Sequence, residues 1–181
     1  MNESGLLGLY WSARPDHLED CGRRAYETLR ALQSLGYEHY YFPGRSRRDA
    51  LKRQLEVTEK NVLTTLSRGV NRRDLPPREP IPELGWRMRL WSGGSDDESY
   101  SISITCGGYS KAVGNSVVLQ LPSRGRFSIS ASPERAVRAY EALLSIWEPA
   151  QAVLCEGSIE WEGDRIVPAR EPLALYRKHR A

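Results

Sequence analysis

Residues 86–105 read Trp-Arg-Met-Arg-Leu-Trp, then Ser-Gly-Gly-Ser-Asp-Asp-Glu-Ser, then Tyr-Ser-Ile-Ser-Ile-Thr. Apolar side chains alternate with other side chains in the first and last runs, which is the period of a strand with one buried face. The glycine-rich middle is typical of a turn. This stretch therefore predicts a hairpin of two strands that each face a core, and it decides that the fold contains an antiparallel sheet.

Further strand-like runs lie on both sides of this hairpin. We expect strands over residues 6–11, 117–121, 127–129 and 152–155, and a second hairpin over residues 158–167. Gly107-Gly108 and Gly163-Asp164 supply turns between them. Together with the first hairpin, the runs at 117–121 and 127–129 predict an antiparallel meander of four strands.

Apolar residues at three- and four-residue spacing predict helices elsewhere. Four are expected, over about residues 17–35, 46–55, 59–68 (after a Thr58 cap) and 133–148 (after a Ser132 cap). Asp16 is the expected N-cap of the first helix, with Glu19 closing a capping box and Gly36 at its end. Ala50 and Leu51 are the expected buried side of the second.

These elements predict an α+β fold in a single domain over residues 1–181. The expected sheet is largely antiparallel, with about five to six strands, and helices pack on one of its faces. Four prolines within residues 76–82 cannot continue a helix or a central strand, so this segment is an expected extended connector.

Composition excludes several classes of protein. The chain has 181 residues, and no apolar run approaches the roughly 20 residues of a membrane span. The N-terminus has no basic and apolar signal sequence, and three scattered cysteines indicate reduced thiols, so we expect a cytoplasmic protein without a membrane partner. The net charge of +3 is unevenly distributed along the chain. Residues 45–78 carry 10 basic and 4 acidic side chains, a net charge of +6. Residues 79–164 carry 7 basic and 12 acidic side chains, a net charge of −5.

No arrangement of residues in the sequence predicts catalysis. The three histidines are scattered, and neither a CxxC nor an HExxH motif occurs, so no metal is expected. The glycines of residues 107–116 lack the lysine placement of a phosphate-binding loop, and no GxSxG motif is present. We therefore expect no catalytic residue, no cofactor and no enzyme activity.

Two basic motifs allow different interpretations. They are residues 44–49, Gly-Arg-Ser-Arg-Arg-Asp, and residues 68–74, Arg-Gly-Val-Asn-Arg-Arg-Asp. Arginines in such motifs can bind phosphates, which suggests a small nucleic-acid-binding module using residues 45–78. Asp49 and Asp74 and the lack of interleaved aromatic residues favour a solvated, salt-bridged face instead. A third interpretation is an Asn-Arg-Arg-Asp turn whose side chains hydrogen-bond neighbouring backbone and fix the connector.

Several motifs in their order resemble the immunity protein 52 family of bacterial polymorphic toxin systems. The resemblance covers about residues 6–122, and its motifs are LYWSAR (9–14), Cys21 with Arg24, GRSR (44–47), Ala50-Leu51, GVNRRD (69–74), ELGW (83–86), LWSGG (90–94), ITCGGYS (104–110) and NSVVLQLP (115–122). The sequence departs from the family pattern at Ser12-Ala13, where Gly-Pro is usual, and at Ser92, where Asn is usual. The residues that carry the resemblance, as scaffold or interface, are Trp11, Arg14, Arg45, Asn71, Arg72, Arg73, Asp74, Trp91 and Asn115.

The resemblance implies a cytoplasmic antidote that binds a toxin encoded beside it and performs no chemistry. In this family the toxin is often a restriction-endonuclease-type nuclease delivered by type VI secretion, and inhibition would occlude its active site or an adjacent surface. Against a nuclease, an acidic patch that mimics phosphates is the expected contact. The candidate residues are Asp96, Asp97, Glu98, Glu156, Glu160 and Glu162. A homodimer is compatible with the sequence, and nucleic acid is not an expected partner of an antidote.

Overall fold

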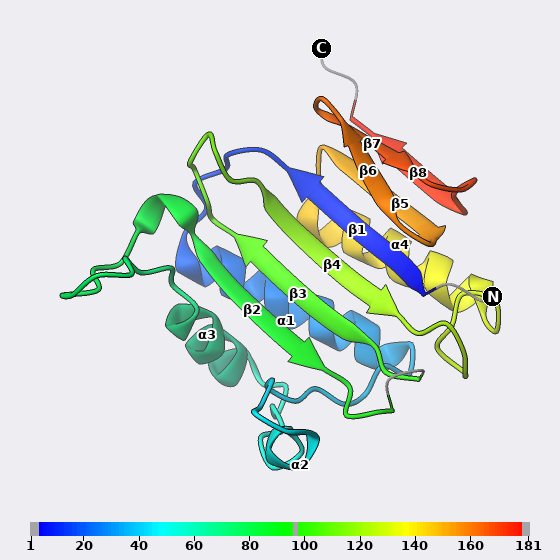
Figure 1. The fold of residues 1–181 in the computed structure, drawn as a ribbon, viewed down its shortest axis with the longest axis horizontal. Helices are drawn as coiled ribbons and strands as arrows, with labels where there is room; N and C mark the ends of the chain where they lie inside the picture. The colour runs from blue at the N-terminus through cyan, green and yellow to red at the C-terminus, as the bar shows by residue number, and fades with distance from the viewer. Residues whose placement is uncertain (1–3, 96–97, 179–181) are drawn as a thin grey trace.

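The computed structural model describes residues 4–95 and 98–178. Its strands are β1 (Gly5–Trp11), β2 (Trp86–Trp91), β3 (Ser101–Cys106), β4 (Asn115–Leu121), β5 (Gln151–Glu156), β6 (Ile159–Glu162), β7 (Arg165–Pro168) and β8 (Ala174–Arg177). Its helices are α1 (Leu18–Ser34), α2 (Arg47–Ala50), α3 (Glu59–Arg68) and α4 (Pro133–Trp147), with a 3-10 turn η1 (Pro82–Leu84). Over these residues, six strands form one antiparallel sheet in the order β2-β3-β4-β1-β5-β8, and β6 pairs with β7 (Figure 1). The predicted α+β class and largely antiparallel sheet are confirmed.

The hairpin predicted from residues 86–105 is formed by β2 and β3, which pair from Trp86 and Cys106 to Trp91 and Ser101. The expected fourth meander strand at 127–129 is wrong, because the place beside β4 belongs to β1. Phe127 instead joins an aromatic cluster, where its ring stacks 5.0 Å from Tyr37 and meets Tyr100 edge-on at 4.9 Å. Burial of these rings therefore outweighs strand pairing at this point.

The long helices lie where the periodicity predicts them, but two of the expected caps and the length of the second helix differ. Ser132 lies at the N-cap position of α4, yet its side chain makes no cap hydrogen bond. Asp16 is not the cap of α1, since its carboxylate accepts hydrogen bonds from Arg14 and Arg24, and the helix begins after His17 without a side-chain cap. The predicted helix over 46–55 is only the single turn α2, and Leu51 is 43% exposed. The chain turns back after α2, where the Arg53 carbonyl accepts from the Phe42 N–H. Thr58 caps α3 as predicted, by accepting from the Asn61 N–H at 3.2 Å.

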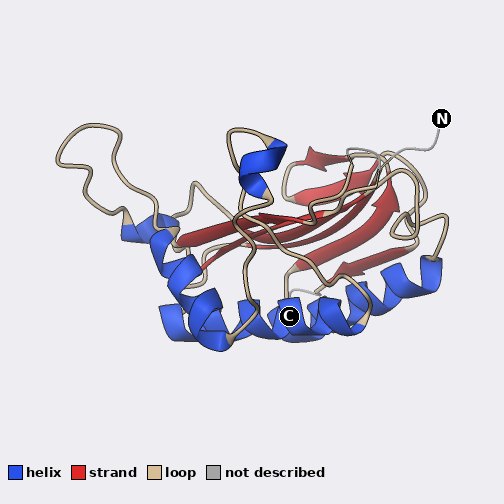
Figure 2. Ribbon diagram, turned by 90° about the horizontal axis from the view of Figure 1, so that it is seen from below, coloured by secondary structure: helices blue, strands red, loops and turns tan. Residues whose placement is uncertain are grey.

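The main core lies between the sheet and the layer of long helices. Figure 2 shows these helices along one face of the sheet and the short helix α2 above the other. The β6–β7 hairpin, predicted from residues 158–167, lies in front of β5 on that other face and covers a small second core of Val153, Cys155 and Ile166 (Figure 1). The strand β8, which the sequence interpretation missed, pairs with β5 at the sheet edge. No helix of the described chain combines the length and apolar character needed to cross a membrane.

Candidate functional site

The sheet face opposite the long helices is only partly covered, and most of its side chains on β2, β3 and β4 are polar. Strand register aligns them in rows, because alternate residues of each strand point to the same face. One row runs Trp91, Ser101, Gln120, Leu6 from β2 to β1, and the next runs Arg89, Ser103, Val118, Gly8. From β2 to β4 this open face is therefore a mainly polar floor, with arginine at the β2 edge.

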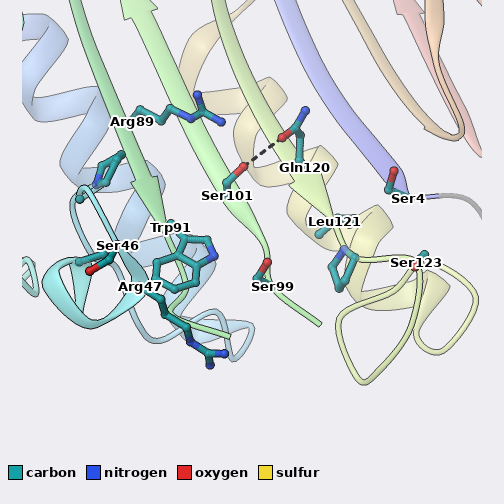
Figure 3. A pocket seen from close by; sticks show the side chains of 14 residues that line it. Ser4, Ser46, Arg47, Arg89, Trp91, Ser99, Ser101, Gln120, Leu121 and Ser123 are labelled. Carbon is teal, nitrogen blue, oxygen red and sulfur yellow. Dashed lines mark hydrogen bonds between the residues drawn. The ribbon is translucent and has the colours of Figure 1, made fainter. Parts of the chain in front are cut away.

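A groove of about 840 Å³ lies on this open face, between the α2 segment and the ends of β3 and β4. Its lining includes two arginines, Arg47 and Arg89, together with Trp91, Gln120 and five serines, and it contains no carboxylate. Figure 3 shows Arg89 reaching from β2 across β3 toward Gln120. The groove is thus rich in hydrogen-bond donors and carries positive charge.

Few of the donors in this groove are used within the protein. The Ser101 hydroxyl donates to the Gln120 side-chain oxygen at 3.1 Å, which leaves the amide nitrogen of Gln120 turned outward (Figure 3). Arg47 donates to the Gly93 carbonyl at 3.1 Å. The side chain of Arg89 makes no hydrogen bond or ion pair with any described residue. An anionic ligand would find these donors available.

The opposite wall of the open face is formed by the β6–β7 hairpin. Trp161 of β6 is 51% exposed and meets the ring of Tyr10 edge-on, with centroids 5.3 Å apart. Burial beneath the hairpin raises the pKa of Tyr10 to about 12. The hairpin is therefore packed against the sheet, and it limits the open face on the β5 side.

The structure does not gather the acidic candidates into one surface. Asp96 and Asp97 lie outside the described residues. Glu98 lines a second hollow of about 440 Å³, with Glu38, His39 and Arg126, at the turn between β2 and β3. Glu156 ends β5, and Glu160 and Glu162 alternate with Trp161 on β6, which places them on the outer side of the hairpin. In Figure 1 this hairpin lies over β5 and the β2–β3 turn lies on the β2 side of the sheet, so strands β4 and β1 run between them.

Three of the residues that carry the family resemblance belong to a hydrogen-bonded junction between sheet and helices. Arg14 donates to Asp16 at 2.7 Å and to the carbonyl of Trp147 at 3.0 Å, and its guanidinium lies 4.8 Å from the Trp11 ring. Trp11 stacks on Trp147 at 5.4 Å. Asn115 is buried and bonds the backbone of Gly108 and Ser12. These contacts give Trp11, Arg14 and Asn115 a scaffold role.

The Asn-Arg-Arg-Asp motif lies in a loop that projects from the body at the left of Figure 2. Asn71 donates to the Leu84 carbonyl at 3.4 Å, and Arg72 donates to the Arg78 carbonyl at 3.3 Å. The interpretation of a turn whose side chains fix the connector is thus confirmed for these two residues. Arg73 and Asp74 are exposed, and so is Arg45 before α2.

The solvent exposure of the expected solvated, salt-bridged face of residues 45–78 is confirmed, but most of its expected salt bridges do not form among the described residues. All ten basic side chains of this segment are exposed, yet among the described residues only Arg53 forms an ion pair, with Asp49 at 3.4 Å. The remaining positive charge is not neutralised by neighbouring carboxylates. The sequence could have indicated this shortage of ion pairs, because the segment contains 10 basic residues and only 4 acidic ones.

The cysteines and the potential metal ligands of the described residues are scattered or buried. The three cysteines are free and buried, and a hydrogen bond that the Cys106 thiol donates to Cys21, together with burial, raises the pKa of Cys106. No group of three or more potential metal ligands occurs among the described residues. The feature that sequence reasoning missed is the open groove, although the serines that alternate with Ile102 and Ile104 indicated a polar outer face.

Comparison with known proteins assigns the chain to a family. No curated protein matches it. The family model for Immunity protein 52 matches residues 3–164, which extends the similarity beyond residue 122 to include α4, β5 and β6. The chain, with its open sheet face and its buried junction of motif residues, belongs to the Immunity protein 52 family.

Proposed function

We propose that this immunity protein neutralises a secreted bacterial toxin encoded beside it, by binding that toxin in the cytoplasm of the producing cell. The observation that carries the proposal is the family match over residues 3–164. In the proposal residues 1–181 act as one immunity domain, and the protein forms a complex with its toxin without catalysing a reaction. Immunity families are generally non-enzymatic.

The toxin we propose is a restriction-endonuclease-type nuclease delivered by type VI secretion. Inhibition would place the immunity protein over the nuclease active site or over an adjacent surface that the reaction requires. The open sheet face supports this mode, because its groove of about 840 Å³ offers unsatisfied donors at one side of a stable sheet. The acidic side chains Glu98, Glu156, Glu160 and Glu162 remain candidate contacts, with Glu98 at the β2–β3 turn, Glu156 at the end of β5, and Glu160 and Glu162 on the β6–β7 hairpin.

Co-expression tests this function directly. The product of the neighbouring reading frame is expressed in a laboratory bacterial strain, alone and together with this chain. We expect growth arrest by the toxin alone, rescue by this chain, and a complex of the two that survives gel filtration. A toxin that kills equally with and without the chain, and that elutes separately from it, would refute the proposal.

A second candidate function has one observation in its favour. The basic segment of residues 45–78 is exposed and contains a single ion pair among the described residues, as a nucleic-acid-binding surface would require. This function predicts binding to a DNA or RNA duplex with an affinity that falls steeply as salt increases. Measurement by fluorescence anisotropy between 50 and about 200 mM salt separates the two functions.

A further inference from the structure

The groove on the open sheet face has a one-sided charge. Its two charged lining residues, Arg47 and Arg89, are both cationic, and the lining holds no acidic residue. The nearby carboxylate of Asp49 is already engaged, since it accepts from the Arg45 N–H at 3.2 Å and pairs with Arg53. The groove therefore lacks a neutralising partner within the described chain.

We propose that this groove is the docking surface for an acidic segment of the toxin, with Arg89 and Arg47 pairing with its carboxylates. The inference rests on the proposed function and names the surface and the chemistry of the contact. Guanidinium groups bind carboxylates through paired, charge-assisted hydrogen bonds, which are stronger than neutral ones. Gln120 and the groove serines supply further donors for the backbone carbonyls of the same segment.

The groove is prepared for such a ligand before it binds. Its floor is made of β3 and β4, central strands that pair on both sides, so their positions are fixed by the sheet. Arg47 is held by the Gly93 carbonyl, which reduces the side-chain entropy lost on binding.

Further arginines around the groove also favour an acidic ligand. Arg87 lies in the adjacent row of β2, and Arg48 is exposed on α2. Like charges at the rim contribute mainly to the rate of association with an acidic surface. A toxin that presents carboxylates to this face would therefore be attracted before contact, and the effect would weaken with salt.

An acidic protein segment fits the groove better than a nucleic acid does. Single-stranded nucleic acids bind along grooves that offer successive aromatic rings for base stacking. Here the only aromatic residue of the lining is Trp91, which is half-buried with its ring 6.4 Å from that of Tyr41. The groove thus offers donors for carboxylates but no series of stacking surfaces.

Charge reversal in the groove tests the inference. The variants are Arg89→Glu and Arg47→Glu, with Arg138→Glu as the matched control, because Arg138 is exposed on α4 in the opposite layer. Binding to the purified product of the neighbouring reading frame is measured by biolayer interferometry, and thermal unfolding confirms that each variant is folded. We expect Arg89→Glu to weaken binding at least about 100-fold, as loss and reversal of a charge pair in an interface imply, and Arg138→Glu to change it less than about twofold.

The other outcomes separate the possible failures. If the wild-type chain binds the toxin and both groove variants bind as tightly, the docking inference is wrong while the proposed function stands. If the wild-type chain does not bind, the proposed function fails and this inference fails with it. A Glu160→Lys/Glu162→Lys variant that loses more affinity than Arg89→Glu would place the contact on the hairpin and overturn the groove. Loss of binding to a labelled 20-base-pair duplex in the groove variants, with toxin binding intact, would overturn it in favour of nucleic acid.

Discussion

Replacing Asn115, at the start of β4, by alanine is the sharpest test of whether the motif residues act as scaffold. Its side chain is 2% exposed. It accepts from the Gly108 N–H at 2.8 Å and donates to the carbonyls of Gly108 at 3.0 Å and Ser12 at 2.9 Å. The change Asn115→Ala removes all three hydrogen bonds at once.

The expected loss of stability depends on whether each backbone group that loses its hydrogen bond to Asn115 finds another partner. The Gly108 carbonyl still accepts from the Arg14 N–H at 2.9 Å, and Ser12 is exposed, so water can replace the lost donor there. The Gly108 N–H is buried and has no replacement, and leaving such a group unpaired costs about 1–3 kcal/mol. With about 1 kcal/mol for the other two bonds, we expect a total loss of about 3 kcal/mol in the free energy of unfolding.

The assay is urea unfolding at pH 7, followed by tryptophan fluorescence and by circular dichroism. For a chain of this length a loss of about 3 kcal/mol lowers the melting temperature by about 6–12 °C. Ser116→Ala is the control, because Ser116 is the next residue of β4 but faces the open side, and its change should stay within about 0.5 kcal/mol. Toxin binding by the folded Asn115→Ala protein should equal that of the wild type.

Two results would refute this reasoning. A loss below about 1 kcal/mol would mean that the buried amide does not hold the junction. Weaker toxin binding by a fully folded variant would make Asn115 an interface residue. The Asn115→Asp change adds a pH test, since the two facing carbonyls raise the pKa of the new carboxyl above its usual value. Its penalty should therefore be small below about pH 4 and grow as the pH rises toward 7.

Three further measurements follow from the core. Thr28→Val should lose about 1–3 kcal/mol in urea unfolding, because it leaves the Trp147 indole N–H without its 2.7 Å acceptor, whereas Thr28→Ser keeps the hydroxyl and should lose less. Cys21, Cys106 and Cys155 are buried, so the native protein should not react with a thiol reagent such as DTNB within minutes at pH 8. After denaturation all three thiols should react. Rapid labelling of the native protein would contradict their burial. Burial raises the pKa of Tyr10, Tyr37, Tyr100 and Tyr140 to about 12 and holds that of Tyr40 well above its usual value. Since these phenols ionise near pH 10 in the unfolded chain, stability should fall as the pH rises from about 10 to 12, and absorbance at 295 nm should show these tyrosines ionising only as the protein unfolds.

Local sequence patterns predicted the elements whose cause is local. The alternation in residues 86–105 matches β2 and β3, and Thr58 caps α3, because both depend on side chains a few residues apart. The failures have tertiary causes. Residues 127–129 have strand-forming side chains, but Phe127 packs on Tyr37, which is 90 residues earlier in the chain. Asp16 has the chemistry of a cap, but two arginines compete for its carboxylate.

The sequence predicted less of the candidate site than of the fold. The excess of positive charge in residues 45–78 was visible, but its lack of ion pairs depends on where the acidic residues lie in space. Glu98, Glu160 and Glu162 looked like one acidic surface because all lie in the acidic segment of residues 79–164. The sheet separates them, because the β2–β3 turn lies on the β2 side, the β6–β7 hairpin lies over β5, and β4 and β1 run between them (Figure 1).

By itself the sequence determined the fold class, the positions of the long helices and most strands, and the resemblance to an immunity family, since periodicity and ordered motifs are properties of neighbouring residues. Only the tertiary structure decided that β1 enters the sheet between β4 and β5, that one sheet face stays open, and that Arg47 and Arg89 line the same groove. Strand order and the juxtaposition of residues 42 positions apart follow from the packing of the whole core, which no local pattern contains.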